Sequence, residues 1–206
     1  METNYSIINS ISITPQSLRC NGKEIFANQG LGFRDYIRDI YKHYAINYQK
    51  FFKMDDLCKL GFIAAELACK DFEFTTSQKE NTALILCNCN ATLDTDSKFV
   101  ETLDSLPSPA LFVYTLPNIM MGEISIRHGF KGENCFFAEA QFDTQFVYNH
   151  AKLILDSTAT ELCLCGWVDF SNEIEFSAHL TLVSKFASIN NCIKFTPNNL
   201  SELFYK

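Results

Sequence analysis

The sequence predicts a layered α/β fold, in which a β-sheet lies between layers of helices. Apolar runs of strand length alternate along the chain with segments whose apolar residues recur at helical spacing. A chain of 206 residues with 47% hydrophobic and 14% aromatic content can bury one good-sized core. No linker, repeat or low-complexity stretch interrupts the alternation, so we expect residues 1–206 to form one domain.

The first expected element is a strand over residues 5–13, which is rich in isoleucine and serine and is followed by Pro15. Residues 16–50 have an irregular pattern, with glycines at turn points. The tyrosines in the second half of that stretch fit an interface surface and half-buried packing equally well.

A helix is expected next, over residues 54–70, where apolar residues repeat at helical spacing. Asp55 and Asp56 stand at its start and Lys70 at its end, so these charges complement the helix dipole. Residues 83–89 form a continuous apolar run, which is typical of a central strand covered on both faces. The acidic side chains that follow, Asp94, Asp96, Glu101 and Asp104, are typical of a solvated helix or loop.

The second half repeats the alternation. Pro117 can occupy the first turn of a helix that continues to Arg127, and Glu123 can pair with Arg127 on its surface. A short strand is expected over residues 135–138. A further helix follows, with Asp143 favouring its N-terminus.

Two more strands and a short helix complete the pattern. Residues 162–168 are typical of a buried strand. In residues 176–183 the apolar side chains alternate with Ser177, His179 and Thr181, so this strand is expected to have one wetter face. Residues 196–199 can open a terminal helix.

Charge and cysteine content bear on the kind of partner and the compartment. The formal net charge of −7, with no basic stripe, argues against a nucleic-acid surface, and no apolar stretch is long enough to span a membrane. The nine cysteines are odd in number and include no C-x-x-C pair. Cys87/Cys89 and Cys163/Cys165 each fall on one face of an expected buried strand, which favours small core side chains over metal ligands. We expect no signal peptide, no metal and no cofactor, and a cytoplasmic protein.

One long stretch carries a specific motif. Leu116-Pro117-Asn118 with Gly122, the tetrapeptide 124–127 (Ile-Ser-Ile-Arg) and the tetrapeptide 131–134 (Lys-Gly-Glu-Asn) match in register the conserved core of β-ketoacyl synthases, members of the thiolase superfamily. The region 108–134 therefore resembles that family, and the order of elements up to residue 183 agrees with it. Trp167 departs from the resemblance, because the family has small residues after the glycine at this point.

The resemblance implies a fold and a missing part. It implies a thiolase-like half, with a mixed five-stranded sheet between helical layers. A β-ketoacyl synthase has two such halves, and its catalytic histidines come from the second. This chain ends about where the first half is expected to end, and its four histidines match neither of those motifs. Of the four, His128 falls in a stretch that the family uses structurally, and His150 is expected to be a structural histidine as well.

The family's acyl-accepting cysteine is replaced. The family has a Thr-Ala-Cys-type turn at the point where this sequence reads Glu139-Ala140-Gln141. A carboxamide cannot attack a thioester as a thiolate does, so acyl transfer through Gln141 is excluded. Chain-length factors of type II polyketide systems, which are inactive partners of an active synthase, also carry glutamine here. A half-length set that resembles them accompanies aryl polyene and flexirubin-type pigment biosynthesis, and this chain is most similar to that set.

The resemblance therefore implies a pseudoenzyme of a type II fatty acid or polyketide system. It would pair with a full-length β-ketoacyl synthase, or with itself as a homodimer, complete the tunnel for the growing acyl chain, and meet acyl carrier protein indirectly. The residues that it assigns to the interface and acyl tunnel are Phe112, Tyr114, Leu116, Met120, Met121, Phe136, Phe137 and Gln141. The methionines also fit an ordinary core.

Two other functions stay open at the level of sequence. The first is decarboxylation of a malonyl group on its carrier protein through Gln141, although this residue fits a simple relic of a lost site nearly as well. The second is a stand-alone module that binds acyl carrier protein or acyl-CoA. Turnover by the purified protein alone would favour the first, and binding of carrier protein without any synthase would favour the second.

Overall fold

The structure is a computed structural model that describes residues 5–157, 159–186 and 193–205. Its centre is a mixed eight-stranded sheet in the order β3-β2-β1-β7-β6-β4-β5, with β8 paired to β1 outside this order. The strands are β1 (Ser6–Ile13), β2 (Ser17–Cys20), β3 (Lys23–Ala27), β4 (Thr82–Asn88), β5 (Asn134–Ala138), β6 (Leu162–Asn172), β7 (Glu175–Ser184) and β8 (Ile193–Lys194).

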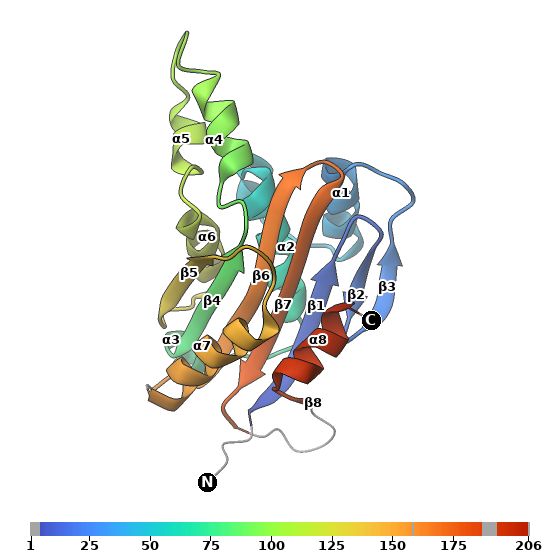
Figure 1. The fold of residues 1–206 in the computed structure, drawn as a ribbon, viewed down its shortest axis with the longest axis vertical. Helices are drawn as coiled ribbons and strands as arrows, with labels where there is room; N and C mark the ends of the chain where they lie inside the picture. The colour runs from blue at the N-terminus through green and yellow to red at the C-terminus, as the bar shows by residue number, and fades with distance from the viewer. Residues whose placement is uncertain (1–4, 158, 187–192, 206) are drawn as a thin grey trace.

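Helices cover both faces of the sheet. In Figure 1, α7 and α8 lie in front of the sheet, and α1 and α2 lie behind it. The helices are α1 (Phe33–His43), a 3₁₀ helix (Gln49–Lys53), α2 (Asp56–Ala68), α3 (Thr76–Glu80), α4 (Leu93–Val100), α5 (Pro109–Val113), α6 (Asn118–His128), α7 (Thr144–Ser157) and α8 (Pro197–Tyr205). The predicted fold class, a mixed sheet between helical layers, is confirmed, but the sheet is wider than the expected five strands.

The core of the molecule is divided by the sheet into two apolar clusters. Strand β4 pairs parallel to both β5 and β6, and every one of its residues is buried. Because side chains alternate along a strand, Leu84 and Leu86 join the cluster under α1, α2 and α6, while Ala83, Ile85 and Cys87 join the one under α7 and α8. The prediction of a central strand covered on both faces is therefore confirmed.

Residues 16–50 contain three regular elements that the pattern did not reveal. Strands β2 and β3 form a hairpin around Asn21-Gly22, whose φ angles of 50° and 78° are those of a type I′ turn. Helix α1 buries Phe33, Tyr36, Ile37, Ile40 and Tyr41. Tyr36 and Tyr41 are therefore core residues rather than an interface surface.

Two expected helices are present, with one correction. Asp55 caps α2, because its Oδ1 accepts a hydrogen bond from the Cys58 N–H at 2.9 Å. The expected surface pair between Glu123 and Arg127 on α6 is wrong. Glu123 is buried and lies 2.7 Å from Lys50 Nζ, and Arg127 donates to Glu66 at 2.8 and 2.9 Å.

The expectation of a wetter face on β7 is also wrong. His179 and Thr181 are both buried. The side chains of Phe142 and Phe204 stack on the His179 ring at 5.5 and 5.0 Å, so the segment before α7 and the helix α8 cover this face.

The described cysteines are all free thiols. Cys163 and Cys165 are buried on the face of β6 that α7 covers, as predicted, and Cys87 joins them from β4. Cys89 is exposed just beyond the end of β4, so its expected place inside the strand is wrong. Within the described part of the chain, no group of three His, Cys, Asp or Glu side chains could hold a metal ion, and no helix has the length and apolar character needed to cross a membrane.

Candidate functional site at the strand ends

The turn that carries Gln141 lies where the parallel strands end. The N–H of Glu139 bonds to the carbonyl of Asn88, so the turn after β5 is tied to the end of β4 at 2.8 Å. Asp143 opens α7, because its Oδ1 accepts hydrogen bonds from the N–H groups of Gln145 and Phe146 at 2.8 and 3.1 Å. Gln141 is exposed, and its carboxamide makes no hydrogen bond with the residues that the structure describes.

A cleft of about 600 Å³ opens beside this turn. Its volume is within the range of ordinary small-molecule sites. The lining residues come from the ends of β4 and β5, from the hairpin of β6 and β7, and from the C-terminus of α8. They are Cys89, Asn90, Ala140, Gln141, Phe142, Trp167, Asp169, Ser171, Glu175, Ser177, His179 and Tyr205.

His179 is the only histidine among the described residues that line the cleft. Its Nδ1 lies 2.9 Å from the Ser12 hydroxyl on the neighbouring strand β1. Burial disfavours the charged imidazolium and lowers the pKa of His179 to about 4. The imidazole is therefore neutral at pH 7, and its Nε2 has no hydrogen-bond partner among the described residues.

A glycine makes the close approach of β6 and β7 possible at this point. Gly166 has a φ of +147°, and a Cβ on it would stand 1.9 Å from the His179 carbonyl oxygen. A larger residue would be strained there and would also clash with the partner strand. Trp167 follows, and its indole N–H donates to the Ser177 hydroxyl at 3.0 Å.

The other side of the cleft is held by Asp169. One of its oxygens accepts hydrogen bonds from the backbone N–H groups of Cys89 and Asn90 at 3.1 and 3.0 Å, and the other accepts from the Asn90 side chain at 2.8 Å. The Asp169 carboxylate thus fixes the loop after β4. Glu175 adds a second carboxylate, and none of the described lining residues is lysine or arginine.

The chemistry available at this site is limited. Gln141 gives the turn before α7 a carboxamide and no thiol, and the neighbouring imidazole of His179 is neutral and buried. The thiol in the cleft, Cys89, lies after β4 instead of at the turn. The two carboxylates disfavour an anionic group in the cleft, because like charges repel.

Of the residues predicted for the interface and tunnel, only Gln141 lines the cleft. Phe112 and Leu116 are exposed on and beside α5, whereas Tyr114 is buried between them. Met120 and Met121 are fully covered within the core of this chain, and a Cβ on Gly61 would stand 2.3 Å from the Met120 sulfur. Substitution of either methionine by a charged residue would therefore perturb this chain's own folding, irrespective of any partner.

Phe136 and Phe137 lie half-buried on β5, at the edge of the sheet. Within the described residues no strand pairs with the outer edge of β5. The ring of Phe137 packs against Phe146 and His150 of α7 at 5.1 and 4.7 Å. His150 also bonds through Nδ1 to the Phe146 carbonyl at 3.0 Å, so its predicted structural role is confirmed.

His128, the other histidine expected to be structural, lies away from the cleft. Its Nε2 is 3.2 Å from Glu66. Burial alone would raise the pKa of Glu66, but the nearby His128 ring and the hydrogen bonds from Arg127 outweigh burial and lower that pKa to about 2. His128 and Arg127 therefore join α6 to α2 through this carboxylate.

Sequence reasoning did not identify His179, Asp169 and Asn90 as site residues. The glycine before Trp167 was the available signal for a special conformation near the site. His179 was visible only as a polar residue in an alternating strand, and nothing in the sequence indicated that α8 would cover it.

No protein-family model matches the sequence, and no curated protein matches it. Solved structures do share the fold. A structure described as "the ishigamide ketosynthase/chain length factor" superposes with a TM-score of 0.63 at 14% identity, over 88% of this chain and 62% of that one. AntDE:AntF, a type II polyketide acyl-carrier protein in complex with its ketosynthase, gives 0.59 at 13% identity, over 89% of this chain and 62% of that one.

A third structure, the ketosynthase ApeO in complex with its chain length factor ApeC from Xenorhabdus doucetiae, gives a TM-score of 0.56 at 12% identity, over 89% of this chain and 80% of that one. This chain thus spans less than two thirds of the length of the first two chains. At sequence identities this low, the structural similarity shows that these proteins share a fold with this chain. The chain has the thiolase-like fold of ketosynthases and chain length factors, and the predicted resemblance is confirmed at that level.

Proposed function

We propose that this protein is a catalytically inactive, chain-length-factor-like subunit that pairs with a full-length β-ketoacyl synthase in a type II fatty acid or polyketide pathway, of the kind that makes aryl polyene or flexirubin-type pigments. The proposal rests on a thiolase-like fold that has Gln141 at the turn where the sequence resemblance expects the acyl-accepting cysteine. Such a turn can position a neighbouring subunit without forming an acyl-enzyme.

The open edge of β5 supports a role as a partner. An unpaired strand edge that carries Phe136 and Phe137 is a template for pairing with another chain, and soluble proteins rarely leave such an edge uncovered. In this proposal the partner synthase pairs with β5, and the exposed Phe112 and Leu116 face that partner, whereas Tyr114 supports them from within this chain. Acyl carrier protein would reach the complex through the synthase.

The cleft gives no support to a malonyl decarboxylase. That reaction needs a pocket that accepts a carboxylate, but Asp169 and Glu175 line the cleft without a described lysine or arginine. Gln141 could still donate a hydrogen bond from its amide, but the charge of the site opposes the substrate.

The proposal is tested by size-exclusion chromatography of the protein with a full-length β-ketoacyl synthase from the same organism, under reducing conditions. We expect one co-eluting complex, and no acyl adduct on this chain by mass spectrometry after incubation with acyl and malonyl carrier proteins. A wild-type protein that stays monomeric at micromolar concentration with and without the synthase would contradict the proposal. Binding of carrier protein alone would then favour the stand-alone module.

A further inference from the structure

The segment 93–116 forms an arm that projects beyond the end of the sheet. It consists of α4, α5 and the loops that join them, and Figure 1 shows it above β4 and β5. Its internal apolar contact is small, with Phe99 and Phe112 packed at 5.5 Å. Large apolar side chains are nonetheless exposed along it, and Leu106, in the loop between α4 and α5, is 84% exposed. The others are Leu93, Val100, Leu103, Phe112, Val113 and Leu116.

The arm also carries a set of acidic side chains, referred to below as its rim. Asp94, Asp96, Glu101 and Asp104 stand against one lysine, Lys98, so four negative charges and one positive charge give the arm a net charge of −3. Scattered single apolar residues on a surface are ordinary, but seven exposed on one protruding segment favour a protein contact there.

The arm is fixed to the body of the protein at its base. The Thr95 hydroxyl donates to Asp55 at 2.7 Å, and the Thr92 hydroxyl donates to the Thr115 carbonyl at 2.9 Å, which ties the two ends of the arm together. Lys98 reaches the buried carboxylate of Asp56 at 3.3 Å.

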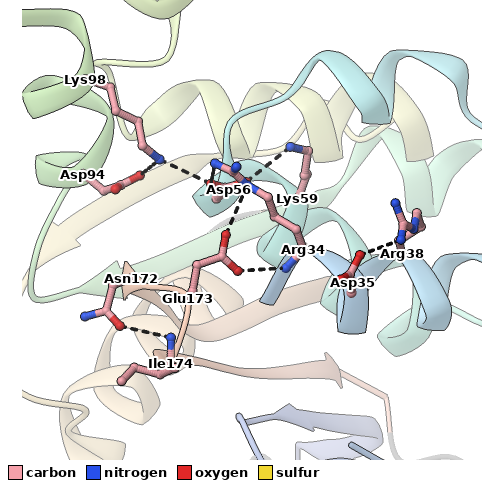
Figure 2. A network of polar contacts seen from close by, with 10 residues as sticks. All are labelled: Arg34, Asp35, Arg38, Asp56, Lys59, Asp94, Lys98, Asn172, Glu173 and Ile174. Atoms are coloured by element: carbon pink, nitrogen blue, oxygen red, sulfur yellow. Dashed lines mark hydrogen bonds and ion pairs between the residues drawn. The ribbon is translucent and has the colours of Figure 1, made fainter. Parts of the chain in front are cut away.

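Asp56 is the centre of a network that holds this base. Figure 2 shows Arg34, Lys59 and Lys98 converging on its carboxylate, at 3.0 to 3.3 Å, from three different helices. Burial opposes the ionised form, but these cations outweigh burial and lower the pKa of Asp56. A base held in this way presents the exposed side chains of the arm in a preset position, which reduces the entropy lost on binding.

We propose that the arm is a docking element that inserts its apolar side chains into an apolar groove rimmed by lysine or arginine on the partner synthase. This inference rests on the proposed function and adds a second contact area to the β5 edge. The open edge and the arm lie on the same side of the molecule in Figure 1, so one partner can cover both.

The charge of the arm distinguishes between two possible partners, a second copy of this chain and the synthase. In a two-fold symmetric homodimer, an arm that meets its own copy places −3 against −3, and this repulsion opposes the contact. A basic rim on a different chain is attracted to the same surface and also speeds the encounter. The synthase therefore fits the arm better than a second copy does.

The test compares variants of exposed arm residues in their affinity for the synthase. Leu103→Gln with Leu106→Gln removes two exposed leucines of the arm, and Glu101→Lys with Asp104→Lys reverses the rim. Neither pair lies in the core, so thermal unfolding should be unchanged. We expect each double variant to raise the Kd by about tenfold or more. For the leucine variant the reason is that burying two leucines contributes on the order of 1.4 kcal/mol or more. For the rim variant the reason is that two lysines would face the basic residues of the partner. Salt should weaken the wild-type complex more than the complex of the rim variant.

Ile25→Gln is the matched control. It removes an exposed apolar side chain from β3, at the opposite edge of the sheet, and should leave the Kd unchanged. If wild type binds the synthase and both arm variants bind within about twofold of it, the arm inference is wrong while the proposed function stands. If wild type does not bind the synthase at all, the proposed function and the arm inference both fail.

Discussion

At the scale of single residues, the proposal of an inactive subunit depends on Gln141. It stands exposed before the first turn of α7, the position where a thiol would benefit from the positive end of the helix dipole. Its neighbours in the cleft provide a neutral imidazole and two carboxylates. The turn before α7 thus carries no thiol, and no lysine or arginine among the described lining residues could stabilise a thiolate there.

Gln141→Cys should therefore introduce a reactive thiol without restoring condensation. We expect alkylation by iodoacetamide at residue 141, measured by peptide mass spectrometry, and no β-ketoacyl product from acyl and malonyl carrier proteins. The reason is that decarboxylation needs a histidine poised at the thioester, and His179 is buried and bonded to Ser12. Cys89→Ser serves as the background, because Cys89 is an exposed thiol in the same cleft. Substantial product from the variant alone would show that a histidine here is catalytic.

His179 should make folding sensitive to mild acid. Its pKa of about 4 lies below the usual 6.5, so the unfolded chain binds more protons than the folded chain between these values. Stability from the neutral imidazole is complete above pH 6.5 and is lost as pH falls toward 4. The difference of about 2.5 pKa units corresponds to a loss of roughly 3 kcal/mol in the free energy of unfolding.

Urea unfolding of wild type and His179→Asn at pH 7.5, 6, 5 and 4 measures this effect. We expect the wild-type free energy of unfolding to fall more steeply than that of the variant across this range. Parallel curves for the two proteins would mean that His179 does not titrate in the folded state as its burial predicts. Glu66, whose pKa is lowered from 4.5 to about 2, also reduces stability at pH 4, but equally in both proteins, so the difference between the curves reports His179.

At the scale of elements, the sequence predicted best where one period dominates. The strands at β1, β4 and β6 and the helices α2 and α6 were evident from continuous or periodic apolar patterns. Helix α1 has equally good spacing, from Phe33 through Tyr36 and Ile40, but its tyrosines were also consistent with a surface. The hairpin of β2 and β3 is short and mostly polar, and the sequence indicated only a glycine turn there.

Burial at the site could not be predicted in the same way. Whether His179 faces water depends on Phe142 and Phe204, which approach it from segments before α7 and in α8. The same holds for Met120, whose place in the core depends on the glycine of α2 opposite it. Such contacts arise between elements far apart in the chain, and periodicity within one element carries no information on them.

The β6–β7 ladder should tolerate no side chain at Gly166. A methyl group there would meet the His179 carbonyl at 1.9 Å, and the φ of +147° is strained for any L-residue. We expect Gly166→Ala to destabilise the protein by about 3 kcal/mol or more, or to prevent folding, as measured by thermal unfolding. Gly122→Ala is the control, because this helical position has nothing within 4 Å of an added Cβ, and should raise stability by about 0.5 to 1 kcal/mol.

The base of the arm should loosen when Asp56 is neutralised. Asp56→Asn removes the carboxylate that faces Arg34, Lys59 and Lys98. Because Arg34 and Lys98 are partly exposed, we expect a loss of about 1 to 3 kcal/mol, less than for a fully buried pair. Hydrogen exchange should quicken in α4 more than in β4. If the substitution changes hydrogen exchange in α4 no more than in β4, the network does not fix the arm.

At the scale of the whole molecule, the fold leaves two surfaces open on one side, the β5 edge and the arm. A partner that covers both would bury on the order of 2,000 Å² or more, the size of a stable interface. The resemblance assigned Phe136 and Phe137 of β5 to the interface, but nothing in the sequence distinguished the exposed leucines of the arm from an ordinary solvated helix. Only the structure shows that the apolar side chains of the arm are exposed instead of packed against the rest of the chain.

A proline on β5 should separate assembly from folding. The Glu139 N–H bonds to β4, and N–H groups alternate between the two sides of a strand, so the N–H of Ala138 points toward the open edge. Ala138 is exposed, and an edge strand accepts proline where its N–H faces outward. Ala138→Pro should therefore keep the wild-type thermal midpoint to within a few degrees while removing one hydrogen bond from any strand pairing across this edge.

The readout is association with the synthase by analytical ultracentrifugation. We expect Ala138→Pro to weaken the complex at least about tenfold, since it both deletes a donor and places a ring against the partner strand. Gln141→Ala, three residues on and outside the strand, should leave association intact. Phe137→Asp is a poorer probe, because Phe137 packs on Phe146 and His150 of the same chain. If Ala138→Pro folds normally and binds the synthase as wild type does, the partner does not pair with β5 and must be held through the arm or another surface.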